Sequence, residues 1–274
     1  MTRLALPQVT LVCVDTRTPA LALAAIAQCT DQIDFGAVKL FTAPGLDLAL
    51  PPGVQALPIQ IDSVAAYSEF MLRGLDRHVD TTHCLVVQWD GYVLDAGQWT
   101  DEFLQWDYLG APLRHEPAER AVGNGGFSLR SKRLLQALQD PALDIHHPED
   151  TCICHANRAR LAAAHGIRIA PLALAKRFAF ERLAPDGPTF GFHGLFNLHR
   201  VMAPEALHQL VAGLPDALAR GLDAHDLCRS LIRQGQLATA RLLIDKRRRL
   251  GMNDRRTWRL RGHWIWARLR GHAS

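Results

Sequence analysis

Four short segments of this sequence carry side chains that could do chemistry, and each is a weak signal alone. QWDGYV spans residues 88–93, GNGGFSLRS spans 123–131, PED spans 148–150 and FGFHG spans 190–194. In this order they supply a carboxylate able to bind metal, a glycine loop, a carboxylate at a helix start and a histidine. An enzyme that moves a sugar from a nucleotide diphosphate to a hydroxyl group needs such a set.

Asp90 is the candidate metal ligand, because it directly follows an apolar run that we expect to be a buried strand. Ligands of open α/β sheets bind beyond the carboxyl ends of the strands. A carboxylate there can hold a divalent cation that bridges two phosphates. The alternative is a structural role, since Asp-Gly is a common turn dipeptide.

Asp150 is the candidate general base. Glu149 and Asp150 fall in the first turn of an expected helix, where the helix dipole favours the ionised form and should lower the pKa. An ionised carboxylate can take the proton of an acceptor hydroxyl as it attacks the anomeric carbon. Simple helix capping is the alternative for the same two acids.

The glycine loop and the late histidine are also open to two interpretations. Gly123, Gly125 and Gly126 would let the backbone approach a ligand closely, or would form a tight turn or bulge. The loop is neither a Walker A loop nor a dinucleotide fingerprint, because the required spacing is absent. His193 could ligate a metal or contact a phosphate, or could be an ordinary hydrogen-bonded histidine.

Other kinds of chemistry find less support. Cys152, Cys154 and His155 suggest zinc, but residues two apart on a helix point to different sides, and no second pair at finger spacing follows. The sequence has no G-x-S-x-G elbow of a serine hydrolase and no kinase-type glycine loop with its H-R-D segment.

The elements that must position these residues read as an α/β sheet followed by helices. Three apolar runs predict buried strands, at residues 9–14, 37–42 and 83–88. Helices are expected at 18–28 and 63–78, capped by Thr18 and Ser63, with a loop-rich stretch at 44–58.

Beyond residue 98 the pattern is less regular. We expect short strands at 107–112 and 167–172, and helices at 99–106, 131–138 and 148–165. From about residue 203 the sequence is helical, and it predicts an antiparallel helix pair hinged at Gly235.

Composition bounds the class of protein. The chain has 274 residues and is 48% hydrophobic, enough for one large domain or for a domain with an appendage. No apolar run approaches the roughly 20 residues that span a bilayer, and the N-terminal sequence lacks the features of a signal peptide. Six scattered cysteines form no disulfide-like framework, which favours a reducing cytoplasm.

Charge is unevenly distributed. Residues 241–270 hold eleven Lys and Arg against two Asp, whereas the rest of the chain is mildly acidic. Trp258, Trp264 and Trp266 alternate with the arginines. This segment could lie on an anionic membrane or a partner, could bind nucleic acid, or could be a solvated basic face whose tryptophans pack on the body.

The order of the four segments resembles the glycosyltransferase-A fold, in which a nucleotide-sugar half precedes an acceptor half. More narrowly, the chain is similar to a bacterial family of uncharacterised predicted glycosyltransferases. The resemblance covers about residues 8–196, and GNGGFSLRS is its most specific part. The segments that carry it are Gln88–Gly91, Asp107–Pro112, Gly123–Ser131 and Glu149–Asp150.

The resemblance implies a glycosyltransferase-A-like (Rossmann-like) mixed sheet flanked by helices at residues 1–200, with an α-helical, basic C-terminal appendage at 201–274. It implies an inverting, hexosyltransferase-like enzyme of polysaccharide biosynthesis that uses Mn²⁺ or Mg²⁺ and a nucleotide-diphosphate sugar, first of all a UDP-sugar. Asp150 is the implied base, and Asp90 and His193 are the implied metal ligands. The implied donor-binding residues are Asp15, Thr16, Arg17, Gln88, Trp89, Asn124, Gly125 and Gly126.

The chain departs from the family pattern at two positions. Gln88 stands where the first acid of a D-x-D motif is expected, and a neutral side chain there should weaken metal affinity. Leu113 stands where a tryptophan usually follows G-A-P.

The acceptor would be a glycan, a lipid-linked sugar or a protein, and the location the cytoplasm, with peripheral contact to the inner membrane face through residues 241–270. Nucleic acid is the least favoured partner. Two rivals stay open: a non-catalytic sugar-nucleotide-binding or scaffold protein, and a nucleotidyltransferase. The second is disfavoured because residues 14–20 lack the early glycine loop.

Overall fold

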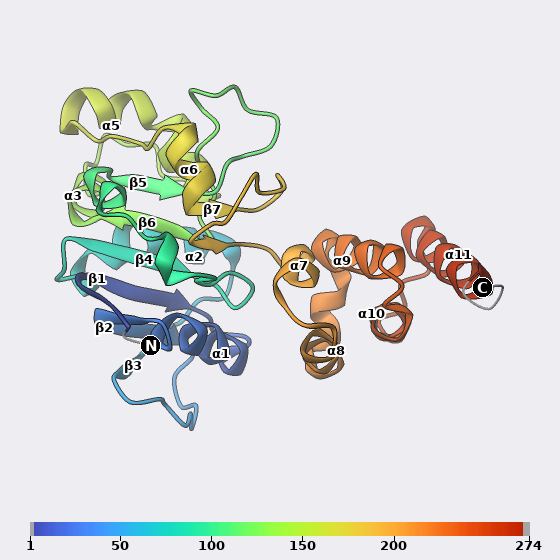
Figure 1. Cartoon of the computed structure of the whole chain (residues 1–274). Coiled ribbons are helices and arrows are strands. Elements are labelled where there is room, and N and C mark those ends of the chain that lie inside the picture. Colours follow the sequence, from blue (N-terminus) through green and yellow to red (C-terminus); the bar gives the residue numbers. More distant parts are fainter. Residues whose placement is uncertain (1–2, 271–274) are drawn as a thin grey trace. The chain divides into compact units, whose positions relative to one another are not determined.

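The computed structural model describes residues 3–270, which form two compact units that meet along the chain between His193 and Gly194. The first unit is an α/β domain and the second is entirely helical (Figure 1). The last residues of the basic C-terminal region, 271–274, lie outside the described residues.

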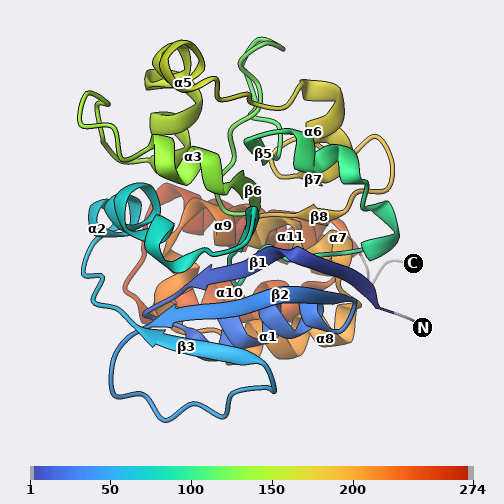
Figure 2. The ribbon, with the colours of Figure 1, turned by 90° about the vertical axis from the view of Figure 1, so that its left-hand side faces the viewer.

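A six-stranded mixed sheet forms the centre of the α/β unit. Its strands are β1 (Leu4–Val14), β2 (Ile33–Thr42), β3 (Val54–Pro58), β4 (His83–Val87), β5 (Tyr108–Gly110) and β6 (Ser128–Ser131). Their order is β3-β2-β1-β4-β6-β5, as labelled in Figure 1, and Figure 2 shows the same sheet from the side. The pairs β1–β2, β2–β3 and β1–β4 are parallel, whereas β6 is antiparallel to both β4 and β5. The predicted α/β class, with a mixed sheet flanked by helices and a helical C-terminal region, is confirmed.

The two faces of the sheet have separate hydrophobic cores, because alternate residues of a strand point to opposite faces. Leu11 and Cys13 of β1 pack with helix α1 (Pro19–Thr30) on one face. Val12 and Val14 pack on the other face with the segment that follows helix α2 (Val64–Glu69). Burial on both faces explains why the strands are continuous apolar runs in the sequence.

Several of the expected elements differ from the structure. The stretch 44–58 contains edge strand β3, which is only five residues long and lies between prolines that are typical of loops. Residues 167–172 form only one bridge, between Ile169 and Tyr108, and not a strand. Residues 63–78 begin as α2, with the Ser63 hydroxyl accepting from Ala66 N at 3.1 Å, but continue as a π-helical turn and a 3₁₀ turn.

The rest of the α/β unit consists of short elements around the sheet edge. They are α3 (Lys132–Ala137), α4 (Glu149–Thr151), α5 (Arg158–His165), α6 (Leu172–Phe178), β7 (Ala179–Phe180) and β8 (Gly191–Phe192). A π-helical turn separates α4 from α5, so the expected helix 148–165 is interrupted. A cluster of aromatic rings, including Phe127, Phe178 and Phe190, holds β8 against the residues that lead into β6.

The helical unit contains α7 (Leu198–Val201), α8 (Pro204–Gly213), α9 (Leu222–Arg233), α10 (Leu237–Arg249) and α11 (Arg255–Arg270). Helices α9 and α10 pack together on either side of Gly235, whose φ of 74° explains the glycine at the turn. Two cations of α10 are structural. Lys246 donates to the carbonyls of Ala212 and Leu214, and Arg247 donates to Ala219 O at 2.8 Å.

All six cysteines are free and buried, as expected for Cys13 and Cys84 from their apolar surroundings. Within residues 3–270, no helix combines the length and the apolar character that crossing a lipid bilayer requires.

Candidate functional site

The antiparallel direction of β6 brings two of the four segments together. Residues that follow β4 lie at its carboxyl end, and residues that precede β6 lie at the same edge, because Val86 of β4 is paired with Ser128 of β6. Gln88 and Gly91 close a tight turn directly after β4, with backbone hydrogen bonds of 3.0 and 3.3 Å. The turn holds the buried side chain of Asp90 at this edge.

His193 links the two segments. Its Nε2 lies 3.1 Å from Gln88 Oε1 and 3.7 Å from Asp90 Oδ1. Its Nδ1 lies 3.2 Å from Asn124 Nδ2 and 3.8 Å from Glu181 Oε1. An imidazole with its proton on Nε2 satisfies the Gln88 and Asn124 contacts together, because Nε2–H then donates to the Gln88 oxygen and Nδ1 accepts from the Asn124 amide.

Gln88 orients this imidazole. Its amide nitrogen donates to the hydroxyl of Tyr67 at 3.1 Å while its oxygen faces His193. Burial raises the pKa of the Tyr67 hydroxyl, so the tyrosine stays neutral. A carboxylate at position 88 could not donate to Tyr67. Gln88, where the resemblance led us to expect an acid, therefore has a defined contact of its own.

The glycines of the loop are required by neighbouring side chains. A Cβ on Gly126 would lie 2.1 Å from His193 Nε2, and a Cβ on Gly125 would lie 2.5 Å from Glu149 Oε1. The Tyr108 hydroxyl fixes the loop by donating to the carbonyls of Gly123 and Asn124 at 2.7 and 3.0 Å. The loop therefore packs directly against the histidine on one side and against the start of α4 on the other.

Asp150 is half-buried against this loop. Its carboxylate accepts from Gly125 N at 3.2 Å and from Thr151 N at 2.7 Å. Burial, and next the charge of Glu149, raise the pKa of Asp150 above its ordinary value, and these effects outweigh the two backbone donors. The expectation that the helix start would lower this pKa is therefore wrong. Helix α4 has three residues and passes directly into a π-helical turn. The backbone donors around Asp150 lower the pKa by less than burial raises it.

A buried ion pair between Arg130 and Glu149 packs against the glycine loop next to Asp150. Arg130, fully buried, lies 3.3 Å from Glu149 Oε1 through Nη2 and donates through Nε to Ser128 Oγ at 3.1 Å. Glu149 also accepts from the Ser68 hydroxyl at 3.4 Å. The sequence showed Glu149 at a helix start and Arg130 inside GNGGFSLRS, but nothing in it paired them. Glu181 beside His193 gave no signal at all.

The residues after β1 lie at the carboxyl end of the neighbouring strand. The Asp15 carboxylate turns back on its own segment and accepts from Arg17 N, Thr18 N and the Thr18 hydroxyl at 2.6–2.8 Å. The Thr16 hydroxyl donates to Ile61 O at 3.4 Å, and Arg17 is exposed. Asp15 thus stabilises the turn that leads into helix α1, whose N-cap is Thr18.

The side chains around His193 provide some, but not all, of the ligands that a metal ion needs. Within residues 3–270, no three His, Cys, Asp or Glu side chains are placed to enclose a metal ion. Asp90 and His193 nevertheless offer a carboxylate and an imidazole 3.7 Å apart. A carboxylate together with substrate phosphates commonly holds Mg²⁺, whereas an imidazole ligand suits transition-metal ions. Trp89, at the tip of the same turn, is half-buried.

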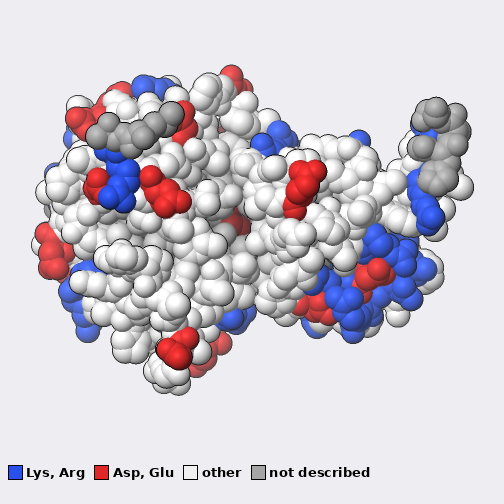
Figure 3. Space-filling model, turned by 60° about the horizontal axis from the view of Figure 1, so that its bottom comes forward, with Lys and Arg blue, Asp and Glu red and all other residues white. Residues whose placement is uncertain are grey.

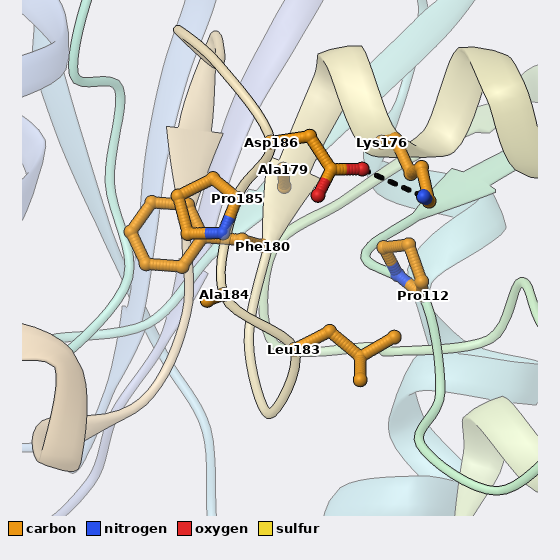
Figure 4. Close-up of a pocket in the computed structure, with 8 residues that line it drawn as sticks. All are labelled: Pro112, Lys176, Ala179, Phe180, Leu183, Ala184, Pro185 and Asp186. Atoms are coloured by element: carbon orange, nitrogen blue, oxygen red, sulfur yellow. Dashed lines mark hydrogen bonds and ion pairs between the residues drawn. The ribbon is translucent and has the colours of Figure 1, made fainter.

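A cavity of about 170 Å³ lies beside β7, where the sequence gave no indication of one. Its lining residues are mostly apolar and include Pro112, Phe180 and Leu183 (Figure 4). Lys176 of α6 and Asp186 form an ion pair of 2.7 Å at its rim. Phe180 immediately precedes Glu181, so this cavity and the His193 cluster share the β7 segment.

Comparison with known proteins gives a family without an assigned activity. A family model described as "Protein of unknown function (DUF5672)" matches residues 54–193, just over half of the 274 residues. No curated protein matches the chain. Among solved structures, an active-site mutant of LgtC is similar with a TM-score of 0.41 and 14% sequence identity, over 67% of this chain and 86% of that chain.

Proposed function

The chain belongs to the DUF5672 family of proteins of unknown function, and we propose that it is a glycosyltransferase that transfers a sugar from a nucleotide diphosphate to an acceptor hydroxyl. The observation that carries the proposal is the convergence of Asp90, His193, the glycine loop and Asp150 at one edge of the sheet. Ligands of open α/β sheets bind at this edge. The family match contains all of these residues.

Asp90 and His193 would hold a divalent metal on the diphosphate. Carboxylate and imidazole together suit Mn²⁺, whereas Mg²⁺ would rely on the carboxylate and the phosphates. The bound ion would neutralise charge that develops on the leaving nucleotide diphosphate. Gln88 contributes no charge. Its oxygen contacts His193 Nε2, the nitrogen that also faces Asp90, so binding of the ion through Nε2 would replace this hydrogen bond and would require the proton to leave Nε2. Thr16, Arg17 and Trp89, which follow strands β1 and β4, would contact the rest of the donor, for which we propose a UDP-sugar.

Asp150 would be the general base of an inverting reaction. A base takes a proton best when its pKa lies near the working pH. Burial and the adjacent Glu149 move the Asp150 pKa in that direction. Gly125 N, which donates to the carboxylate, would fix the oxygen that faces the acceptor. The acceptor hydroxyl belongs to a glycan, a lipid-linked sugar or a protein.

The test is release of free nucleotide diphosphate from a panel of nucleotide sugars, measured with Mn²⁺ and with a chelator. Asp150→Asn keeps the shape of the side chain and removes the base, so turnover should fall by about 10²–10⁴-fold. Asp62→Asn is the matched control, because Asp62 is exposed and lies outside the cluster. Full turnover in both Asp150→Asn and Asp90→Asn would overturn the proposed roles.

A non-catalytic sugar-nucleotide-binding protein is the second candidate, and Gln88 in place of an acid favours it. Calorimetry separates the two: nucleotide binding without release from any nucleotide sugar supports the binding protein. Pyrophosphate release from a nucleoside triphosphate and a sugar phosphate would instead indicate a nucleotidyltransferase. Asp15 argues against that activity, because its carboxylate occupies the turn after β1 where a phosphate-binding loop would be needed.

A further inference from the structure

Helix α11 is anchored to the helical unit along one face only. Thr257 and Leu260 are buried, and the indole of Trp264 donates to Leu237 O at 2.8 Å. The Thr257 hydroxyl also accepts from the buried Arg247 at 3.0 Å. These contacts fix the rotation of the helix about its own axis, so the direction of its other side chains is determined.

The opposite face of α11 exposes large apolar side chains. Trp258, Ile265, Trp266 and Leu269 are exposed to 57%, 51%, 55% and 68%. At 100° per residue, these four positions fall within an arc of about 100°, centred opposite the buried face. An apolar stripe of this width normally faces a core. On α11 it lies on the side away from the core of its own unit.

Arginines border this stripe on both sides. The helix contains six arginines and no acidic residue. Arg261 stacks over Trp258 at 4.7 Å, and Arg270 stacks over Trp266 at 3.6 Å. Within residues 3–270, none of the six is found in an ion pair with a carboxylate. Long arginine side chains beside exposed indoles can reach polar groups while the apolar residues between them enter a less polar phase.

The remaining cations of the basic segment are engaged in the fold. Lys246 and Arg247 are buried. Arg249 pairs with Asp216 at 2.6 Å, and Arg241 pairs with Asp245 at 2.8 Å. Lys and Arg side chains gather over the C-terminal helices in Figure 3, but the structure separates those that hold α10 in place from those of α11. Among the described cations of residues 241–270, those of α11 make no ion pair with a carboxylate, and they lie beside the apolar stripe.

We propose that α11 is an interfacial helix that docks this protein on an anionic lipid surface. Its stripe would enter the boundary between headgroups and acyl chains, with the tryptophans at headgroup depth and the arginines on lipid phosphates. A nucleic acid would meet the arginines but would leave Ile265 and Leu269 without an apolar phase. A second copy of α11 would place arginines against arginines. The lipid surface satisfies both properties of the helix.

The test is flotation of the full chain with vesicles of neutral phosphatidylcholine and with vesicles that also contain phosphatidylglycerol. We expect binding to the anionic vesicles alone, weakened but not abolished by salt. Each surface arginine contributes about fivefold in affinity. The combined variant Arg255→Gln, Arg256→Gln, Arg259→Gln should therefore bind on the order of a hundredfold more weakly. Arg229→Gln with Arg233→Gln, on the exposed side of α9, is the control.

A second variant tests the apolar stripe. Trp266→Gln with Leu269→Gln keeps good helix formers and should weaken binding at least tenfold, whereas Leu222→Gln, exposed to 53% on α9, should not. Circular dichroism confirms that each variant is folded. Equal binding to neutral vesicles, or wild-type binding by both α11 variants, would overturn the proposal. So would binding of duplex DNA or RNA without lipid, or self-association that the stripe variant removes.

Discussion

Replacing Gly126 with alanine would place a methyl group against the imidazole of His193. The new Cβ would lie 2.1 Å from Nε2 and 2.5 Å from both neighbouring ring carbons, whereas ordinary contact begins at about 3.4 Å. The ring must therefore retreat by about 1.3 Å. It can do so by rotating, because the obstacle is the end of a side chain and not backbone.

That movement has a small cost in stability and a large cost in function. It breaks the contacts of His193 with Gln88 and Asn124, and a net hydrogen bond contributes about 0.5–1.5 kcal/mol. We expect a loss of about 1–3 kcal/mol in the free energy of unfolding. A displacement of about 1 Å in a catalytic group can lower the rate by about 10²-fold, or 2.7 kcal/mol in the activation barrier.

Nucleotide release with Mn²⁺ and urea denaturation measure the two effects on the same variants. Gly187→Ala is the control for activity and stability, since nothing lies within 4 Å of its added Cβ. Gly110→Ala is the contrast: its Cβ would lie 2.2 Å from the backbone oxygen of Asn124, so it should be destabilised more strongly than Gly126→Ala. If Gly126→Ala turns over as fast as Gly187→Ala, then the position of His193 does not matter to the reaction.

Three further predictions concern the same edge of the sheet. The folded-state pKa of Asp150 is raised, so the protonated form contributes stability at low pH that is lost as pH rises through the folded pKa. Asp150→Asn should therefore have a higher melting temperature than the wild type at neutral pH. This difference in melting temperature should vanish at a pH below the ordinary carboxyl pKa. Wild-type turnover should rise as the pH passes through the raised pKa of Asp150. A lower melting temperature for this variant at neutral pH would contradict that cause. Arg130→Met leaves Glu149 buried without its partner and should cost about 3–5 kcal/mol in urea unfolding, part of it recovered by adding Glu149→Gln; additive losses would refute the pairing. Asp90→Asn should weaken Mn²⁺ binding in the presence of nucleotide diphosphate at least tenfold by calorimetry, and an unchanged affinity would remove Asp90 from the metal site.

The sequence predicts best where one local rule decides the structure. The strands at 9–14, 37–42 and 83–88 are buried on both faces, so their apolar runs are unmistakable. Gly235 and Ser63 mark a helix turn and a helix start through backbone chemistry that has few alternatives. Edge strand β3 was missed because it is short and lies between prolines that indicate a loop. Residues 167–172 were wrongly predicted as a strand because the alternation of Ile167 and Ile169 does not reveal whether a neighbouring strand is available for pairing.

For the site, too, the sequence predicted individual residues better than the contacts between them. Asp90, Asp150 and His193 could be singled out because their residue types and positions suggest chemistry. The contacts between them could not, because they depend on the antiparallel direction of β6 and on the packing of β8. Glu181 and the Arg130–Glu149 pair became visible only when distant segments met. The pKa of Asp150 was expected in the wrong direction, because burial is a tertiary property and outweighs a helix of three residues.

The six buried thiols allow unfolding of the two units to be followed by chemical labelling. Thiol reagents attack the thiolate, and burial raises the pKa of Cys29, Cys84 and Cys228 to about 12, so the native chain should react slowly. Five of the cysteines belong to the sheet domain, and Cys228 alone reports on the helices. The residue modified first under mild denaturant, identified by mass spectrometry, would therefore show which half of the chain opens first.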